Sequence, residues 1–469
     1  MLESRKLRMI FLLFFIFVIG STSAGPMINN GDFWQTAQSM GVHVPAWKPL
    51  AHSYPISTPV HFRYLTMSMI VSLGYVILFA IGSHQYYVSL IFWSLNLIFF
   101  SGLYCLITEI RETMHRNIYM ILYGILYAIY GFFFRSIYLE ASVLAVSPWF
   151  LLGVHRLLTS NRYTIFTIAS WFLIMSNVQM LFIVPIVIWI LLTNTNKIKA
   201  IRLTASILIV SATVPFLLLH EYKAGLNMPN DYDRYYSGIG YAIQDAYAWP
   251  ARTFNARAAY FYKHRAQLER KSIKCEPYKN ESLLGTDYWP TGTQLRKESY
   301  TKEGVAVCKK MGCDNVIHKG DLKHFSEFFL DHPELMFRYL KNTFLITLRA
   351  NYNISYLRTP SAEGLEYFYY ISVVQRFILD SAGYLFFAIG LVAIALRPSI
   401  KTAVIVVYFF IGAPIFVVLG DGFFEFEKHM VAYFMIITIP VYLALYGGSR
   451  SVFAQSIDSS DERNVRPGS

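Results

Sequence analysis

Charged residues are scarce in this chain, and they are unevenly spread along it. Asp, Glu, Lys and Arg make up 15% of the 469 residues, against about 25% in a typical soluble domain. Hydrophobic residues make up 55%, the mean hydropathy is +0.39, and the few charges fall in short clusters between long apolar runs. This pattern excludes an ordinary soluble protein and predicts a polytopic helical membrane protein.

The motifs of soluble nucleotide and hydrolase chemistry are also missing. The chain has no P-loop, no GxGxxG turn after a strand, no HExxH and no GxSxG. Its four cysteines do not stand in a metal-binding spacing with histidine. Three of them, Cys275, Cys308 and Cys313, lie in the one large polar region. If that region is extracytoplasmic, one disulfide and one leftover thiol are compatible with it.

The formal net charge of +12 does not indicate a nucleic-acid partner. Lysine and arginine recur in short clusters between the apolar runs, which is the distribution expected of cytoplasmic loops in a membrane protein. The clusters predicted to be cytoplasmic are Arg111/His115/Arg116, Arg156/Arg162, Lys197/Lys199/Arg202, Arg397/Lys401 and Arg450.

The first 25 residues admit two interpretations. Three basic residues precede an apolar stretch that ends in small polar residues at 21–25, as in a cleaved signal peptide. An uncleaved first span is favoured in a chain this apolar. In either case Asp32 is predicted to lie outside.

The basic clusters also decide which apolar runs cross the membrane. The runs are 9–25, 64–82, 86–107, 118–134, 137–158, 163–194, 203–220, 369–396, 402–419 and 429–446. Every basic cluster faces the cytoplasm if 64–82 lies along the outer surface and 163–194 breaks near 176–179 into two spans. The alternative lets 64–82 cross and keeps 163–194 whole, which moves Glu140 to the inside.

The favoured topology is an all-α polytopic membrane protein of about ten transmembrane helices with both ends in the cytoplasm. Residues 1–220 are predicted to form an N-terminal transmembrane module with a catalytic first outer loop. Residues 221–368 would form an extracytoplasmic, mostly helical loop domain, and 369–449 a C-terminal transmembrane module. The polar tail 450–469 is predicted to be cytoplasmic and disordered.

Two acids stand at the predicted outer face. Asp32 follows the first apolar run, where a carboxylate can act as general base on a hydroxyl or ligate a divalent cation such as Mg²⁺ or Mn²⁺. Glu140 lies between two apolar runs, where an acid is costly unless it is paired or functional. The competing interpretation of Asp32 is a solvated loop aspartate. For Glu140 it is a salt bridge with Arg135 or a plain interfacial acid.

A second charged cluster, 420–429, separates the last two apolar runs. Its lysine and histidine could neutralise a phosphate leaving group, which requires cations. Lys48 and Arg63 in the first loop are further candidates for the same role, and the competing interpretation of the cluster is interfacial anchoring with local Glu–Lys pairs. The candidate substrate-binding residues of the cluster are Asp421, Glu425, Glu427, Lys428 and His429.

The first loop resembles that of the GT-C class of membrane glycosyltransferases. In that class an acid follows the first span, and a Tyr/Pro segment leads into an apolar juxtamembrane helix that ends in a Phe-Gly-like pair. Here 54–59 leads into 64–82, whose last residues are Phe79-Ala80-Ile81-Gly82. The resemblance implies a juxtamembrane helix at 64–82.

Three further segments are similar to those of bacterial hexosyltransferases of surface-layer glycan clusters, namely 230–238, 332–334 and 420–429. Two departures are visible. A single Asp32 stands where the family has tandem acids, which leaves a metal requirement open, and Lys428-His429 replaces an Arg-Tyr pair.

The resemblance implies transfer of a sugar from a polyprenyl-phosphate-linked donor to a glycan or lipid-linked glycan on the extracytoplasmic face of the cell (inner) membrane. Asp32 and Glu140 would be catalytic, Lys428 and His429 would bind the donor phosphate, and membrane lipids would be the other partner. One alternative is an O-antigen or capsule polymerase, which relies on loop arginines; here these would be Arg252, Arg257 and Arg265. The other is a non-enzymatic transporter of lipid-linked glycans, whose acids would line a path through the spans.

Overall fold

The computed structural model describes residues 42, 53–55, 65–83, 85–135, 138–195, 197–223, 326–327, 329–330, 333–349, 381–396, 398–421 and 426–446. This part of the chain is mostly helical, as the composition predicted. Its elements are β1 (Ser53–Pro55), α3 (Leu65–Ala80), β2 (Gln85–Tyr87), α4 (Val88–Glu109), α5 (Thr113–Tyr130), the 3-10 helix η1 (Gly131–Arg135), α6 (Leu139–Ser160), α7 (Thr164–Ile174), the 3-10 helix η2 (Val178–Ile183), α8 (Val184–Asn194), α9 (Lys197–Lys223), α19 (Pro333–Arg349), α21 (Ala382–Leu396), α22 (Ile400–Asp421), α23 (Phe426–Met435) and α24 (Thr438–Tyr446).

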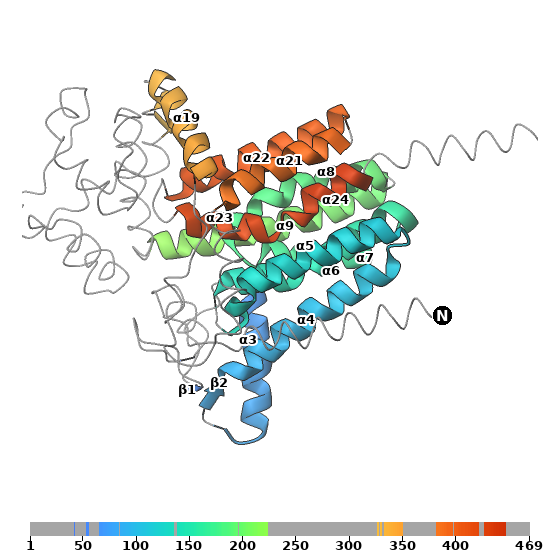
Figure 1. Cartoon of the computed structure of the whole chain (residues 1–469). Helices are drawn as coiled ribbons and strands as arrows, with labels where there is room; N and C mark the ends of the chain where they lie inside the picture. The colour runs from blue at the N-terminus through green and yellow to red at the C-terminus, as the bar shows by residue number, and fades with distance from the viewer. Residues whose placement is uncertain are drawn as a thin grey trace, which may run out of the picture.

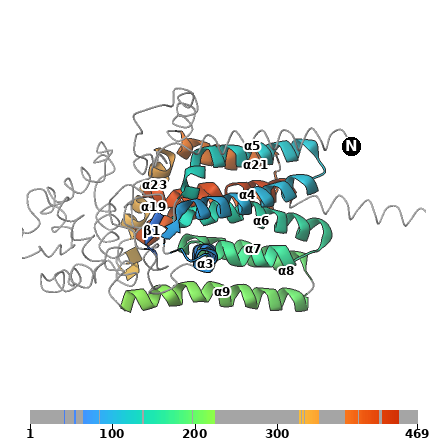
Figure 2. The ribbon, with the colours of Figure 1, turned by 90° about the horizontal axis from the view of Figure 1, so that it is seen from below.

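Most of these helices run side by side along a common axis and alternate in direction (Figures 1 and 2). Among the residues that the structure describes, three segments are long and apolar enough to cross a membrane: Ser89–Glu109 in α4, Leu139–Ser160 in α6 and Ile400–Leu419 in α22. In the most apolar stretch of α6, 83% of the residues are buried, against 56% and 50% in the other two. α6 is therefore the central helix, and it packs against α4 on one side and α7 on the other.

α3 lies across the bundle rather than along it, and Figure 2 shows it end-on beside α7. The strands on either side of it, β1 and β2, pair antiparallel with Ser53 opposite Tyr87. Because β1 and β2 pair, the segment between them, which contains α3, must begin and end on the same side of the bundle. Thr66 Oγ1 at the start of α3 donates to the carbonyl oxygen of Phe172 near the end of α7 at 2.5 Å. The run 64–82 therefore lies across the bundle, in keeping with a helix that makes no net crossing.

The long apolar run 163–194 is broken, as predicted. α7 ends at Ile174, and Asn177 begins η2 with its side-chain oxygen accepting the Gln179 N–H at 3.1 Å. Short polar side chains of this kind compete with the helical ladder for backbone groups. η2 then runs into α8, which has a proline in its first turn, where the missing N–H costs nothing.

The last apolar run is two helices rather than one. α23 ends at Met435, and α24 begins at Thr438. The turn between them is closed by backbone bonds that reach back three residues instead of four, from Ile436 N–H to the Tyr433 oxygen and from Ile439 N–H to the Ile436 oxygen. Pro440 has no N–H to give to the Ile436 carbonyl, so the helical ladder of backbone bonds loses one member at this point. The Ile439 bond satisfies that carbonyl instead.

Much of the predicted loop domain 221–368 lies outside the described residues. Its largest described element, α19, is anchored to the bundle, because Tyr339 Oη donates to the Val418 oxygen of α22 at 2.8 Å. A Cβ added at Gly383 of α21 would lie 2.1 Å from the Thr347 oxygen of α19, so the two backbones meet at this glycine.

Candidate functional site

The helices α4, α6, α8 and α21 finish at one end of the bundle (Figure 2). Positively charged residues gather at this end, which we call the basic end. Arg156 of α6 pairs there with Glu109 of α4. Arg397 and Arg450 of the predicted clusters lie outside the described residues. The described members of those clusters share this one end, as the charge pattern predicted, and they are Arg111, His115, Arg116, Arg156, Arg162, Lys197, Lys199, Arg202 and Lys401.

Glu140 lies at the opposite end, which we call the loop end and define as the end where α6, η2 and α23 begin. It stands in the first turn of α6 and is 6% exposed. The free N–H groups of a helix N-terminus favour an anion at this position. An acid buried this deeply in an apolar protein is a candidate for function. The structure thus puts Glu140 at the end opposite the basic residues, as the favoured topology requires.

His429 also lies at the loop end, in the first turns of α23. Its Nδ1 is 2.6 Å from the side-chain nitrogen of Gln179 in η2. One turn later on α23, Tyr433 Oη donates to the backbone oxygen of the same Gln179 at 3.1 Å. Two residues on one face of α23 therefore bind one residue of η2. Because α23 also packs against α6, the helix of Glu140, the two predicted site residues stand on neighbouring helices at one end.

η2 is fixed from a second side by α22. Phe182 stacks on Tyr408 with ring centres 4.5 Å apart, and Tyr408 Oη donates to the Phe182 oxygen at 2.6 Å. The short 3-10 helix is thus held between α22 and α23. Its polar residue Gln179 has little freedom to move.

The other predicted site residues are placed only in part. Asp421 ends α22, and Glu427 and Lys428 lie in the first turn of α23, so their backbones stand at the loop end with His429. The catalytic acid predicted at Asp32 lies outside the described residues. So do the predicted substrate-binding residues Lys48, Arg63 and Glu425.

No metal site is found among the described residues: no three His, Cys, Asp or Glu side chains are gathered so that they could hold an ion. Glu140 and His429 are the two described side chains of this kind that the sequence assigned to the site. Metal ligation by Asp32 remains a prediction from the sequence.

Gln179 was not among the residues predicted for the site. Residues 176–179 were expected only to break the apolar run. The signal was nevertheless present, since two amides, Asn177 and Gln179, stand close together in a run of some thirty residues that is otherwise almost wholly apolar. Polar side chains inside membrane segments mark functional or packing sites more often than polar side chains elsewhere.

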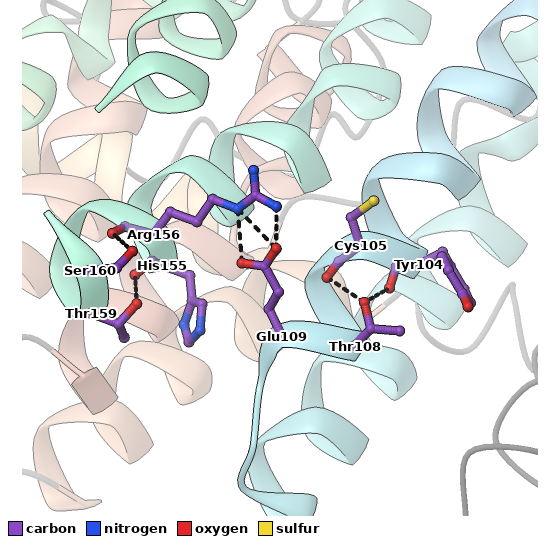
Figure 3. A network of polar contacts seen from close by, with 8 residues as sticks. All are labelled: Tyr104, Cys105, Thr108, Glu109, His155, Arg156, Thr159 and Ser160. Carbon is purple, nitrogen blue, oxygen red and sulfur yellow. Dashed lines mark hydrogen bonds and ion pairs between the residues drawn. The ribbon is translucent and has the colours of Figure 1, made fainter. Parts of the chain in front are cut away.

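The basic end carries a second polar network, shown in Figure 3. Arg156 Nε lies 2.9 Å from each carboxylate oxygen of Glu109. Next to it on α6, His155 Nδ1 is 2.6 Å from Tyr442 Oη of α24. These contacts join α4, α6 and α24 at the end remote from Glu140. We therefore interpret this network as a structural one that holds α4, α6 and α24 together.

Comparison with known proteins adds no relative. A scan against protein-family models finds no match, and neither does a search of curated proteins nor one of solved structures.

Proposed function

We propose that this protein is a membrane-embedded glycosyltransferase of the GT-C type. It would transfer a sugar from a polyprenyl-phosphate-linked donor to a surface glycan on the extracytoplasmic face of the cell (inner) membrane. The observation that carries the proposal is the position of Glu140 and His429 on neighbouring helices at the loop end, with the basic residues at the other end. By the charge rule the basic end would face the cytoplasm, so Glu140 and the proposed phosphate ligand His429 would stand together outside.

Both residue types are needed for this reaction. The acceptor hydroxyl gives its proton to a carboxylate as its oxygen bonds to the anomeric carbon, and the bond from that carbon to the phosphate oxygen breaks. The phosphate leaves with added negative charge, which cationic or N–H donors stabilise. Glu140 and Asp32 are proposed for the first role, and His429 and Lys428 for the second. Asp421, Glu425, Glu427, Lys48 and Arg63 are proposed to line the substrate path.

α3 supports the lipid part of the proposal. One face of α3 packs on the bundle, and its other face is exposed and apolar, with Met69, Leu73, Val76 and Ile77 exposed and the exposed Ile81 just after the helix. The helix is 16 residues long, or roughly 24 Å, which is shorter than a hydrocarbon core of about 30 Å. A short apolar helix across the loop end is suited to lie at the membrane surface beside the entry path of a lipid-linked sugar.

The proposal is tested on surface glycan from a strain that lacks the gene. The strain is complemented with wild type, Asp32→Ala, Glu140→Gln or the exposed control Glu112→Gln, and the glycans are compared by gel. We expect the deletion to shift each band by a small uniform step, restored by wild type and by Glu112→Gln only. A ladder that collapses to one repeat unit and is restored by Asp32→Ala would instead identify a polymerase.

A further inference from the structure

Gln179 is held at three points. Its backbone N–H donates to Asn177 Oδ1 at 3.1 Å, and its backbone oxygen accepts from Tyr433 Oη at 3.1 Å. Its side-chain nitrogen lies 2.6 Å from His429 Nδ1. These contacts fix both the backbone and the amide of Gln179, so the amide presents a set direction to the imidazole ring.

The contact with Gln179 determines which nitrogen of His429 carries the proton. With the amide nitrogen donating, Nδ1 accepts, and the neutral ring carries its proton on Nε2. In this tautomer Nε2–H is a donor, which is the form that a phosphate oxygen requires.

The side-chain amide of Gln179 would lower the stability of the fold if it served only for packing. Gln179 is 8% exposed, and its Oε1 has no hydrogen-bond partner among the described residues. A buried amide oxygen without a partner destabilises the fold, and an apolar side chain of the same size would avoid that cost. The bond that the amide makes to His429 is the feature that an apolar residue could not supply.

We propose that Gln179 is a positioning residue that orients His429, through Nδ1, so that its Nε2–H donates to the phosphate of the lipid-linked donor. Gln179 acts through the ring and does not itself touch the donor. The inference rests on the proposed function in one respect, because it takes His429 as a ligand of the donor phosphate.

The test uses the purified full chain and farnesyl phosphate, a short polyprenyl phosphate, with farnesol as the uncharged control. Affinity is measured from the rise in the midpoint of thermal unfolding as the probe concentration increases. The main variant is Gln179→Met, which keeps nearly the same side-chain volume without hydrogen-bonding groups. We expect it to bind farnesyl phosphate about tenfold more weakly, the worth of about one hydrogen bond to a charged group. Farnesol binding should not change.

Three further variants separate positioning from packing. His429→Ala should weaken binding at least as much as Gln179→Met, and the double variant should be no weaker than His429→Ala, because both changes remove one interaction. Tyr123→Phe removes the buried bond from Thr438 Oγ1 of α24 to Tyr123 Oη of α5 and does not touch η2. It should lower the unfolding midpoint without changing the affinity.

The outcomes distinguish the inference from the function on which it rests. If His429→Ala weakens binding and Gln179→Met does not, positioning by Gln179 is wrong while the phosphate role of His429 stands. If neither variant weakens binding, the phosphate role fails and the inference fails with it. If Tyr123→Phe weakens binding as much as Gln179→Met does, the Gln179 contact acts only through the stability of the fold, and positioning is again wrong.

Discussion

Arg156 of α6 and Glu109 of α4 form a two-pronged ion pair, in which Arg156 Nε lies 2.9 Å from both carboxylate oxygens. The two side chains are 27% and 32% exposed, so water screens the pair in part. It stands at the basic end, where the central helix and α4 both finish. The pair therefore locks two helices at the end opposite the proposed site.

The first prediction concerns the strength of this pair. Glu109→Gln and Arg156→Ala should each lower the free energy of unfolding, and a double-mutant cycle should give a coupling of about 1 kcal/mol. Unfolding by sodium dodecyl sulfate in mixed micelles measures the change. Arg162→Ala, an exposed arginine at the same end, is the matched control and should change stability by less than about 0.5 kcal/mol. Equal effects of Arg156→Ala and Arg162→Ala would show that the pair contributes nothing specific.

A second prediction follows from Gly74 and Tyr86. A Cβ added at Gly74 of α3 would lie 2.7 Å from Tyr86 Oη. Tyr86 cannot swing away, because it is fully buried and its strand pairs with Tyr54. Its hydroxyl has no hydrogen-bond partner among the described residues, and burial raises its pKa, so it stays neutral.

Gly74→Ala should therefore cost about 1–3 kcal/mol of stability through overpacking. Tyr86→Phe removes the clashing atom together with a buried hydroxyl, and in that background the cost of Gly74→Ala should fall by at least about 1 kcal/mol. The thermal unfolding midpoints of the two single variants and the double variant measure this. Additive effects would mean that α3 does not rest on Tyr86 as described.

Features that depend on local pattern could be predicted from the sequence. The break near 176–179 follows from polar residues inside a long apolar run, and the structure adds its cause in the cap by Asn177. The transverse position of α3 follows from the distribution of the basic clusters, which limits how many runs cross the membrane but says nothing of how the helices pack. The same distribution predicted Glu140 at the outer face, opposite the basic clusters.

Features that depend on contacts between distant residues could not be predicted. Gln179 and His429 are 250 positions apart, and Glu109 and Arg156 are 47 apart. Hydropathy sets which residues face lipid or protein, but the pairing of helices depends on how their side chains interlock. The turn before Pro440 was not predicted. The apolar composition of 429–446 indicates a membrane segment, but it does not reveal where the backbone hydrogen bonds of a helix are interrupted.

A third prediction tests the topology with single cysteines. The parent replaces the native cysteines Cys105, Cys275, Cys308 and Cys313 with serine. Ser53→Cys and Gln85→Cys flank α3 in paired strands and should both react with a membrane-impermeant maleimide in intact cells. Arg162→Cys at the basic end should react only after the membrane is opened. Labelling of Arg162→Cys in intact cells would restore the alternative in which 64–82 crosses.

The last prediction concerns Glu140. Glu140→Gln keeps the shape of the buried side chain and removes its ability to take a proton, so the rate of sugar transfer should fall about 100-fold or more. The fold should survive, because a neutral amide is easier to bury than a carboxylate. Transfer from a lipid-linked sugar in isolated membranes measures the rate, and the thermal unfolding midpoint reports the fold.

The matched control is Glu112→Gln at the basic end, where the side chain is 65% exposed and pairs with His115. It should leave the rate unchanged. Full transfer activity in a folded Glu140→Gln protein would leave Glu140 a structural acid and remove it from the proposed mechanism.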